Sequence, residues 1–199
     1  MGEISSGVTT MVFNFLILGL TGNTGIAAYG VVANVALVAT AVFNGISQGS
    51  QPLLSDYYGK NDDKSVQKIL RLSIITGIAA AVLIILVTNL IPDVIVAVFN
   101  NENNAEMASY AVFGVQLYFT GFLFAGFNII GTGFLSATES AAWAFITSVL
   151  RGFVAISLCA LLLSALFGMT GVWLAFPVAE FITAVLMVIA IAQNVRKMR

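Results

Sequence analysis

The sequence of 199 residues contains no histidine and one cysteine, Cys159. A disulfide within the chain and a cysteine–histidine metal site are therefore excluded. Charged residues make up only 9% of the chain, against about 25% in soluble domains. With a net charge of −1, the chain has no basic footprint for a nucleic-acid partner. No Lys or Arg precedes Lys60, so the N-terminus does not resemble a signal peptide and instead resembles a membrane helix that starts in mid-protein.

The chain also lacks the motifs of common catalytic sites. It has neither a Gly-x-Ser-x-Gly nucleophile motif nor the Gly-x-x-x-x-Gly-Lys loop that holds nucleotide phosphates. We therefore expect a protein that is not an enzyme, with no catalytic residue, no metal site and no organic cofactor.

Long apolar runs fill most of the sequence. Hydrophobic residues make up 59% of the chain, and a helix needs about 20 of them to cross the hydrocarbon. Unbroken runs such as IAAAVLIILV at residues 78–87 argue against barrel strands, which alternate over about 10 residues. We predict an all-α fold, a polytopic membrane helix bundle with six transmembrane helices in one domain over residues 1–199. The predicted spans are residues 4–20, 26–58, 66–91, 105–137, 141–167 and 172–192.

The basic residues indicate the side of the membrane on which each turn lies. Four flank the turn between the second and third spans, and three follow the sixth span; these are Lys60, Lys64, Lys68, Arg71, Arg196, Lys197 and Arg199. The opposite loops carry Asp93, Glu102 and Glu106 and no Lys or Arg. The positive-inside rule makes the basic side cytoplasmic. We therefore predict a multi-pass protein of the plasma membrane, or cell inner membrane, surrounded by lipid, with both termini cytoplasmic.

The second span carries a stripe of amide side chains. At 100° per residue, Asn34, Asn44, Gln48 and Gln51 fall within an arc of about 100°. Lipid penalises such groups, so we expect the stripe to face the bundle interior or a wet cavity. Either the amides only bond neighbouring helices, or they line a cavity used by substrate.

The same span contains residues that change helix shape and packing. Pro52 lacks an N–H and crowds the carbonyl of Gln48, which predicts a kink with a freed carbonyl there. Gly45 and Gly49 form a pair of small residues that lets another helix approach closely. Pro177 is a second predicted kink, in the sixth span.

Polar residues also mark the first and fourth spans. Asn14 is the strongly polar side chain deep in the first span, and Gln116, Tyr118 and Asn128 are candidate cavity residues in the fourth. Several glycines weaken the fourth helix, because glycine costs about 1 kcal/mol relative to alanine, and they predict close packing or bending. Its aromatic residues are candidates for an apolar cavity wall; they are Phe113, Tyr118, Phe119, Phe122 and Phe124.

Glu180 and Arg151 are the charged residues farthest from the ends of the predicted spans. Glu180 is about 24 Å of helix from Arg196, so no obvious basic partner is expected for it. An intramembrane carboxylate suggests function, so Glu180 is a candidate for a proton-linked role; alternatively it is a hydrogen-bonded structural residue or lies near the outer interface. Arg151 either snorkels at the cytoplasmic interface or forms a buried pair with an acidic residue, for which Asp56 and Glu139 are candidates.

Four stretches of the sequence resemble one transporter family. They are AAYGVVANVALVATAVFNGISQGSQPLLSDYYGKND (residues 27–62), FLSAT (134–138), LRG (150–152) and GVWLAFPVAEF (171–181). With the order of the spans, they resemble the C-terminal six-helix half of the multidrug and toxic compound extrusion (MATE) family. GISQGSQPLLSDYYG is the most specific stretch and is similar to the subgroup of damage-inducible and Staphylococcus-type multidrug exporters.

The resemblance implies a twelve-helix protein in which two six-helix lobes enclose a cavity. Such exporters move small cationic or amphipathic drugs outward in exchange for H⁺ or Na⁺ by rocking the lobes. This chain would supply one lobe, and its partner would be an N-terminal six-helix lobe. Some members carry a Glu in the first helix of this half and an Asp in the fourth. This chain has Asn14 and no acidic residue there, so the coupling-ion site would lie mostly in the other lobe.

Two other functions fit the same pattern. One is a lipid-linked oligosaccharide flippase of the same superfamily, which would carry basic residues in its cavity to hold the diphosphate. The other is a truncated membrane protein that assembles without transporting.

Overall fold

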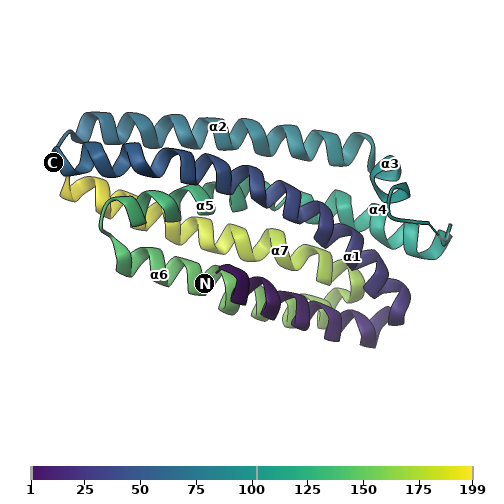
Figure 1. Cartoon of the computed structure of the whole chain (residues 1–199). Helices are drawn as coiled ribbons and strands as arrows, with labels where there is room; N and C mark the ends of the chain where they lie inside the picture. Colours follow the sequence, from purple (N-terminus) through teal and green to yellow (C-terminus); the bar gives the residue numbers. More distant parts are fainter. Residues whose placement is uncertain (1, 102, 199) are drawn as a thin grey trace.

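The structure is a computed structural model that describes residues 2–101 and 103–198, so Glu102 and Arg199, used in the charge argument, lie outside the described residues. It is an all-α bundle of long helices lying side by side (Figure 1). The helices are α1 (Gly2–Gly59), α2 (Asp63–Leu90), α3 (Pro92–Ala97), α4 (Ala105–Phe119), α5 (Phe122–Ala137), α6 (Ala141–Val149), η1 (Leu150–Ala155) and α7 (Ile156–Lys197).

Helices α1 and α7 each fold back on themselves at a glycine. Gly22 has φ 65° and ψ −154°, and Gly168 has φ 58° and ψ −135°, a conformation essentially restricted to glycine. Figure 1 shows the chain reversing at both points. Both reversals fall in the gaps between predicted spans, at residues 21–25 and 168–171. We call residues 23–59 the long arm of α1 and residues 169–197 the C-terminal arm of α7.

The fourth predicted span, whose glycines predicted close packing or bending, is broken into two helices. Helices α4 and α5 meet at an angle of 49°, and the break lies at Thr120 and Gly121. A side chain at Gly121 would lie 2.7 Å from the ring of Phe176 and 2.9 Å from the Cα of Pro177. The bend therefore brings the backbone of this helix directly against α7, an approach that requires glycine.

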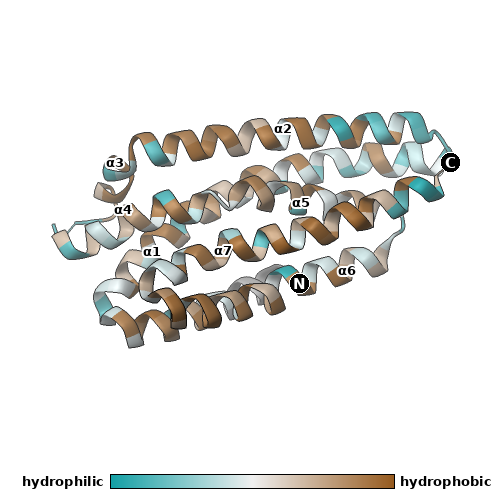
Figure 2. Cartoon of the chain, turned by 180° about the vertical axis from the view of Figure 1, so that it is seen from behind, coloured by the Kyte–Doolittle hydropathy of each residue, from teal (hydrophilic) through white to brown (hydrophobic). Residues whose placement is uncertain are grey.

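The surface of the bundle is suited to lipid. Phe15, Leu90 and Leu166 expose 78%, 76% and 72% of their surface, and apolar residues cover the middle of the long helices (Figure 2). Among the described residues, three helices are long and apolar enough to cross a membrane, or four if α4 and α5 count as one span. Two of those three contain the glycine reversals.

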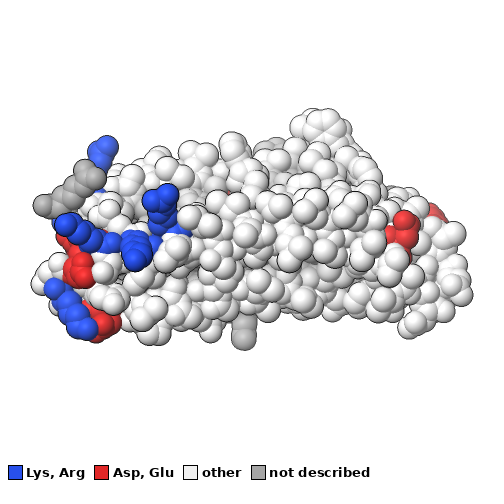
Figure 3. All heavy atoms as spheres, turned by 90° about the horizontal axis from the view of Figure 1, so that it is seen from above, with Lys and Arg blue, Asp and Glu red and all other residues white. Residues whose placement is uncertain are grey.

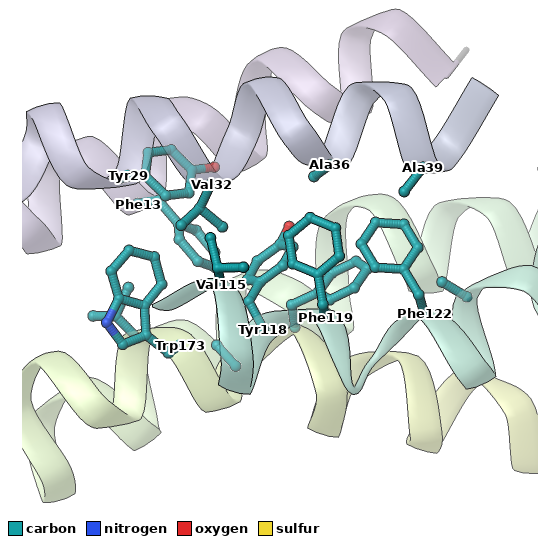
Figure 4. Close-up of a cluster of buried hydrophobic side chains, with 14 of the residues drawn as sticks. Phe13, Tyr29, Val32, Ala36, Ala39, Val115, Tyr118, Phe119, Phe122 and Trp173 are labelled. Carbon is teal, nitrogen blue, oxygen red and sulfur yellow. The ribbon is translucent and has the colours of Figure 1, made fainter. Parts of the chain in front are cut away.

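The interior is filled by aromatic side chains from α1, α4, α5 and α7 (Figure 4). Phe119 and Phe122 expose at most 1% of their surface and lie with their ring centres 5.0 Å apart. Phe122 also packs on Phe43 of α1, at 6.0 Å. The prediction that Phe119 and Phe122 could form a cavity wall is wrong, because both are enclosed in the core of this bundle. Phe113, in contrast, is exposed.

Candidate substrate pathway and buried polar cluster

The amide stripe lies on an open face of the long arm of α1. Asn34, Asn44 and Gln48 are exposed and Gln51 is half-buried, whereas Phe43, on the opposite side of the helix, is fully buried. Within this bundle the stripe therefore points away from the interior. The side chains that fill the interior are apolar, and the outward side of the helix combines these amides with exposed apolar residues such as Leu37 and Val38.

The hydrogen bonds of the stripe run within α1. The Nδ2 of Asn34 donates to the carbonyl of Gly30 at 2.8 Å, and the Nε2 of Gln51 donates to the hydroxyl of Ser47 at 3.4 Å. Ser47 in turn donates to the carbonyl of Ile129 in α5 at 3.4 Å. Of these three hydrogen bonds, the one from Ser47 to Ile129 reaches a neighbouring helix. The amides of Asn44 and Gln48 face the surroundings of the bundle.

Gly45, Gly49 and Pro52, which lie beside the stripe, are also exposed. A side chain added at Gly45 or Gly49 would meet nothing within 4 Å, and Pro52 is exposed. Helix α1 keeps helical backbone angles at Pro52, and helix α7 keeps them at Pro177. The backbone angles that are not helical lie at Gly22 in α1 and at Gly168 in α7. The surface around Gly45 and Gly49 is therefore flat and free for a helix from outside this bundle.

The other candidate cavity residues do not join the stripe. Asn14 and Gln116 are half-buried. Tyr118 is 7% exposed and stacks on Phe176, with ring centres 4.2 Å apart and planes 7° from parallel. Asn128 is fully buried in α5. Two hollows of about 550 and 480 Å³ lie elsewhere, and both have mainly apolar linings.

A buried polar cluster joins α5, η1 and α7. The Nε of Arg151 donates to Oε1 of Glu180 at 2.5 Å, and the Nδ2 of Asn128 donates to Oε2 of the same carboxylate at 2.7 Å and to its backbone carbonyl at 2.9 Å. The side chain of Glu180 is 4% exposed and that of Arg151 is 26% exposed. Such a pair is tolerated in an apolar interior because each charge compensates the other.

The cluster corrects the expectation that Glu180 has no basic partner. Of the two alternatives for Arg151, the structure has the buried pair, with Glu180 in place of Asp56 or Glu139; Asp56 pairs with Lys60 instead. The distance from Glu180 to Arg196 along the same helix did not exclude a basic partner from another helix. Arg196 and Lys197 are exposed on the last turn of α7, and the partner of Glu180 is Arg151 of η1.

Arg151 sits in a short π-helix, Leu150–Ala155. A π-turn carries an extra residue and is rare, and it occurs often at functional sites. Periodicity at 3.6 residues per turn could not reveal it. The signal available in the sequence was the pair itself, one cation and one anion placed in two consecutive apolar spans.

A bundle of apolar helices with a compensated ion pair inside and amides on one open face is typical of an integral membrane protein. The MatE family profile matches residues 3–161, and the chain belongs to the MATE family of transporters. It is 28% identical over 184 residues to the multidrug export protein MepA of Staphylococcus saprophyticus, covering 92% of this chain and 39% of that protein. It is 30% identical over 182 residues to MepA of Staphylococcus haemolyticus, covering 90% of this chain and 39% of the relative.

Solved structures have the same fold at low sequence identity. The chain superposes with a TM-score of 0.92 on an outward-facing multidrug resistance MATE family transporter of the MOP superfamily, at 11% identity over 99% of this chain and 44% of that one. The inward-facing form gives a TM-score of 0.93, also at 11% identity, over 99% of this chain and 46% of that one. The chain thus spans less than half the length of its relatives and corresponds to one lobe of a MATE transporter.

Proposed function

We propose that this chain is the C-terminal, six-span lobe of a secondary active multidrug exporter, which moves cationic or amphipathic compounds outward in exchange for H⁺ or Na⁺. The observation that carries the proposal is the amide stripe of Asn34, Asn44, Gln48 and Gln51 on an otherwise apolar, open helix face. Four amides facing hydrocarbon would be costly. Facing a second lobe across a wet cavity, they bind drug and water instead.

The shape of the open face supports a second lobe as its partner. Gly45 and Gly49 leave room for a helix to approach closely. The similarity to both outward-facing and inward-facing transporters supports a lobe that keeps its fold while it moves. In the complete transporter the two lobes rock about the cavity between them, as in other transporters built from two related halves.

The charge distribution supports the orientation predicted from the sequence. Lys and Arg gather at one end of the bundle together with several acidic residues, whereas the other end shows acidic residues and no basic ones in this view (Figure 3). We place the basic end in the cytoplasm of a plasma-membrane protein, with both ends of this chain on that side. The Asn44–Gln51 stretch then lies deeper in the membrane than the turn at residues 59–63.

In this proposal the ion pair of Arg151 and Glu180 holds the lobe together and the coupling carboxylate lies in the other lobe. The guanidinium already compensates the Glu180 charge, so the carboxylate has a structural partner within this lobe. The competing proposal makes Glu180 the proton carrier. It predicts that Glu180→Gln abolishes coupled export at unchanged stability, whereas a structural pair predicts that stability falls first.

The experiment is an accumulation assay with both lobes in one membrane. Cells that express this chain with a matching N-terminal six-helix lobe should accumulate less ethidium than cells with either lobe alone. Asn44→Leu or Gln48→Leu should raise accumulation while leaving the membrane level of the chain unchanged. Asn89→Leu is the matched control, because Asn89 is an exposed asparagine on α2 that bonds to its own helix at Ile85.

Two results would overturn the proposal. Unchanged ethidium accumulation with both halves present in the membrane would favour a non-transporting protein. Full export by the Asn44→Leu and Gln48→Leu variants would remove the stripe from the pathway. The flippase alternative is disfavoured because the stripe consists of amides and Arg151 is engaged by Glu180.

A further inference from the structure

One face of α2 carries basic residues at its start and apolar residues after them. Lys64, Lys68 and Arg71 are exposed and follow one another by four and three residues, so they lie on one side of the helix. The same spacing continues into four exposed apolar residues, Ile75, Ile78, Val82 and Leu86, which are 44–52% exposed. We call these seven residues the α2 stripe.

Lys68 and Arg71 of the α2 stripe have no ion-pair partner among the side chains that the structure describes, whereas Lys64 attracts the carboxylate of Asp62. Among the side chains that the structure describes (residue 7, residues 9–101 and residues 103–198), the ion pairs are Lys60 with Asp56 and Arg151 with Glu180. The nearby carboxylate of Asp62 accepts hydrogen bonds from the backbone and hydroxyl of Ser65 at 3.1 and 2.6 Å and so caps α2. Figure 3 shows the blue side chains gathered at this end of the bundle.

A hollow of about 480 Å³ lies beside Arg71, between α2 and the last turns of α7. Gln67 and Arg71 supply its polar lining, and its apolar lining consists of Leu70, Ile74, Ile75 and Val195. A ligand that fits it has an anionic or hydrogen-bonding head and a hydrocarbon body, because the polar and apolar parts of the lining adjoin each other.

Arg71 marks the level of the membrane interface. Residues 72–90 carry no charge and rise about 28 Å as a helix, close to the hydrocarbon thickness of about 30 Å. Lys68 and Arg71 therefore lie at headgroup level, and the apolar part of the stripe lies along the acyl chains.

We propose that the α2 stripe and the adjoining hollow bind an anionic phospholipid of the cytoplasmic leaflet. Its phosphate contacts Lys68 and Arg71, Lys64 contacts the outer part of the headgroup, and one acyl chain lies along Ile75 and Ile78. Basic pockets between helices on the cytoplasmic side are known to bind anionic headgroups. A soluble anion would use the cations but gain nothing from the four apolar residues, so the stripe as a whole selects a lipid. This inference does not depend on the proposed transport function.

The test is native mass spectrometry of the full chain, released from micelles that contain equal amounts of phosphatidylglycerol and phosphatidylcholine. The wild type should retain phosphatidylglycerol preferentially. Lys68→Gln/Arg71→Gln should lower that preference by about tenfold or more, since each basic residue near an anionic surface adds severalfold to its attraction. Lys60→Gln/Lys197→Gln is the matched control, because it removes two exposed cations outside the stripe and should leave the preference unchanged. Circular dichroism verifies that each variant is folded.

Three outcomes would overturn the proposal. An equal loss in the control would show a general charge effect. Displacement of the lipid by millimolar glycerol phosphate would show a site for the headgroup alone. An unchanged preference in Lys68→Gln/Arg71→Gln would place the lipid elsewhere. Ile75→Ser/Ile78→Ser should weaken the binding of both lipids together, which separates the acyl-chain contact from the headgroup contact.

Discussion

The ion pair between Arg151 and Glu180 should respond asymmetrically to mutation. Arg151→Met leaves a carboxylate whose side chain is 4% exposed, with a hydrogen bond from Asn128. Removing one partner of a buried pair costs about 3–5 kcal/mol. Glu180→Met leaves an arginine whose side chain is already 26% exposed and whose long stem lets the charge reach water. Its loss should be smaller, about 2 kcal/mol.

The double variant separates the pair from its parts. Arg151→Met/Glu180→Met replaces two compensating charges by apolar groups of similar length, which is often close to neutral, within about 1 kcal/mol of the wild type. The free energy of unfolding of the full chain is measured in mixed micelles by titration with a denaturing detergent. Lys197→Met, an exposed cation on the last turn of α7, is the control and should change nothing.

The double-mutant cycle decides the outcome. The two single losses, set against a double variant within about 1 kcal/mol of the wild type, give a coupling energy of about 4 kcal/mol or more. The reasoning would be refuted if the two single losses were equal and added up in the double variant to within about 0.5 kcal/mol, as they do for independent sites.

Three further changes test other parts of the fold. Gly168→Ala should lower the unfolding free energy by about 1–3 kcal/mol, because φ 58° with ψ −135° suits glycine alone; an unchanged value would contradict the reversal. In the same titration, Gly126→Ala should cost about 1–3 kcal/mol, since its Cβ would lie 2.4 Å from the ring of Phe43, whereas Gly45→Ala, which meets nothing within 4 Å, should not destabilise. Cys159, 8% exposed, should react with a polar maleimide only after denaturation, and rapid labelling of the native chain would contradict its burial.

The sequence predicted the helical membrane character and the turning points better than the helix interiors. Glycine-rich stretches at residues 21–25 and 168–171 predicted turns because glycine tolerates positive φ, and Gly22 and Gly168 adopt it. The break at Gly121 was not predicted at its position. Five glycines weaken this span equally on propensity, and the contact with Phe176 and Pro177 of α7 selects one of them. Such tertiary contacts overrule local preference.

The polar residues show the same limit. Helical periodicity placed Asn44 and Gln48 on one face, and the structure shows which side of that helix is buried. Helical periodicity could not show that Asn128 turns inward to Glu180, because this hydrogen bond joins two residues that are 52 positions apart in the sequence. The π-helix at Arg151 also escapes a reading based on 3.6 residues per turn.

The reversals at Gly22 and Gly168 leave almost no backbone between the arms that they join. Each pair of arms is therefore a tight helical hairpin. An insertion at either glycine would have to separate the two packed arms. The turn at residues 60–62 and the loop at residues 98–104 lie between separate helices and can lengthen without that cost. Epitope tags, fluorophores and protease sites for following this lobe in a membrane belong in those two segments, one at each end of the bundle.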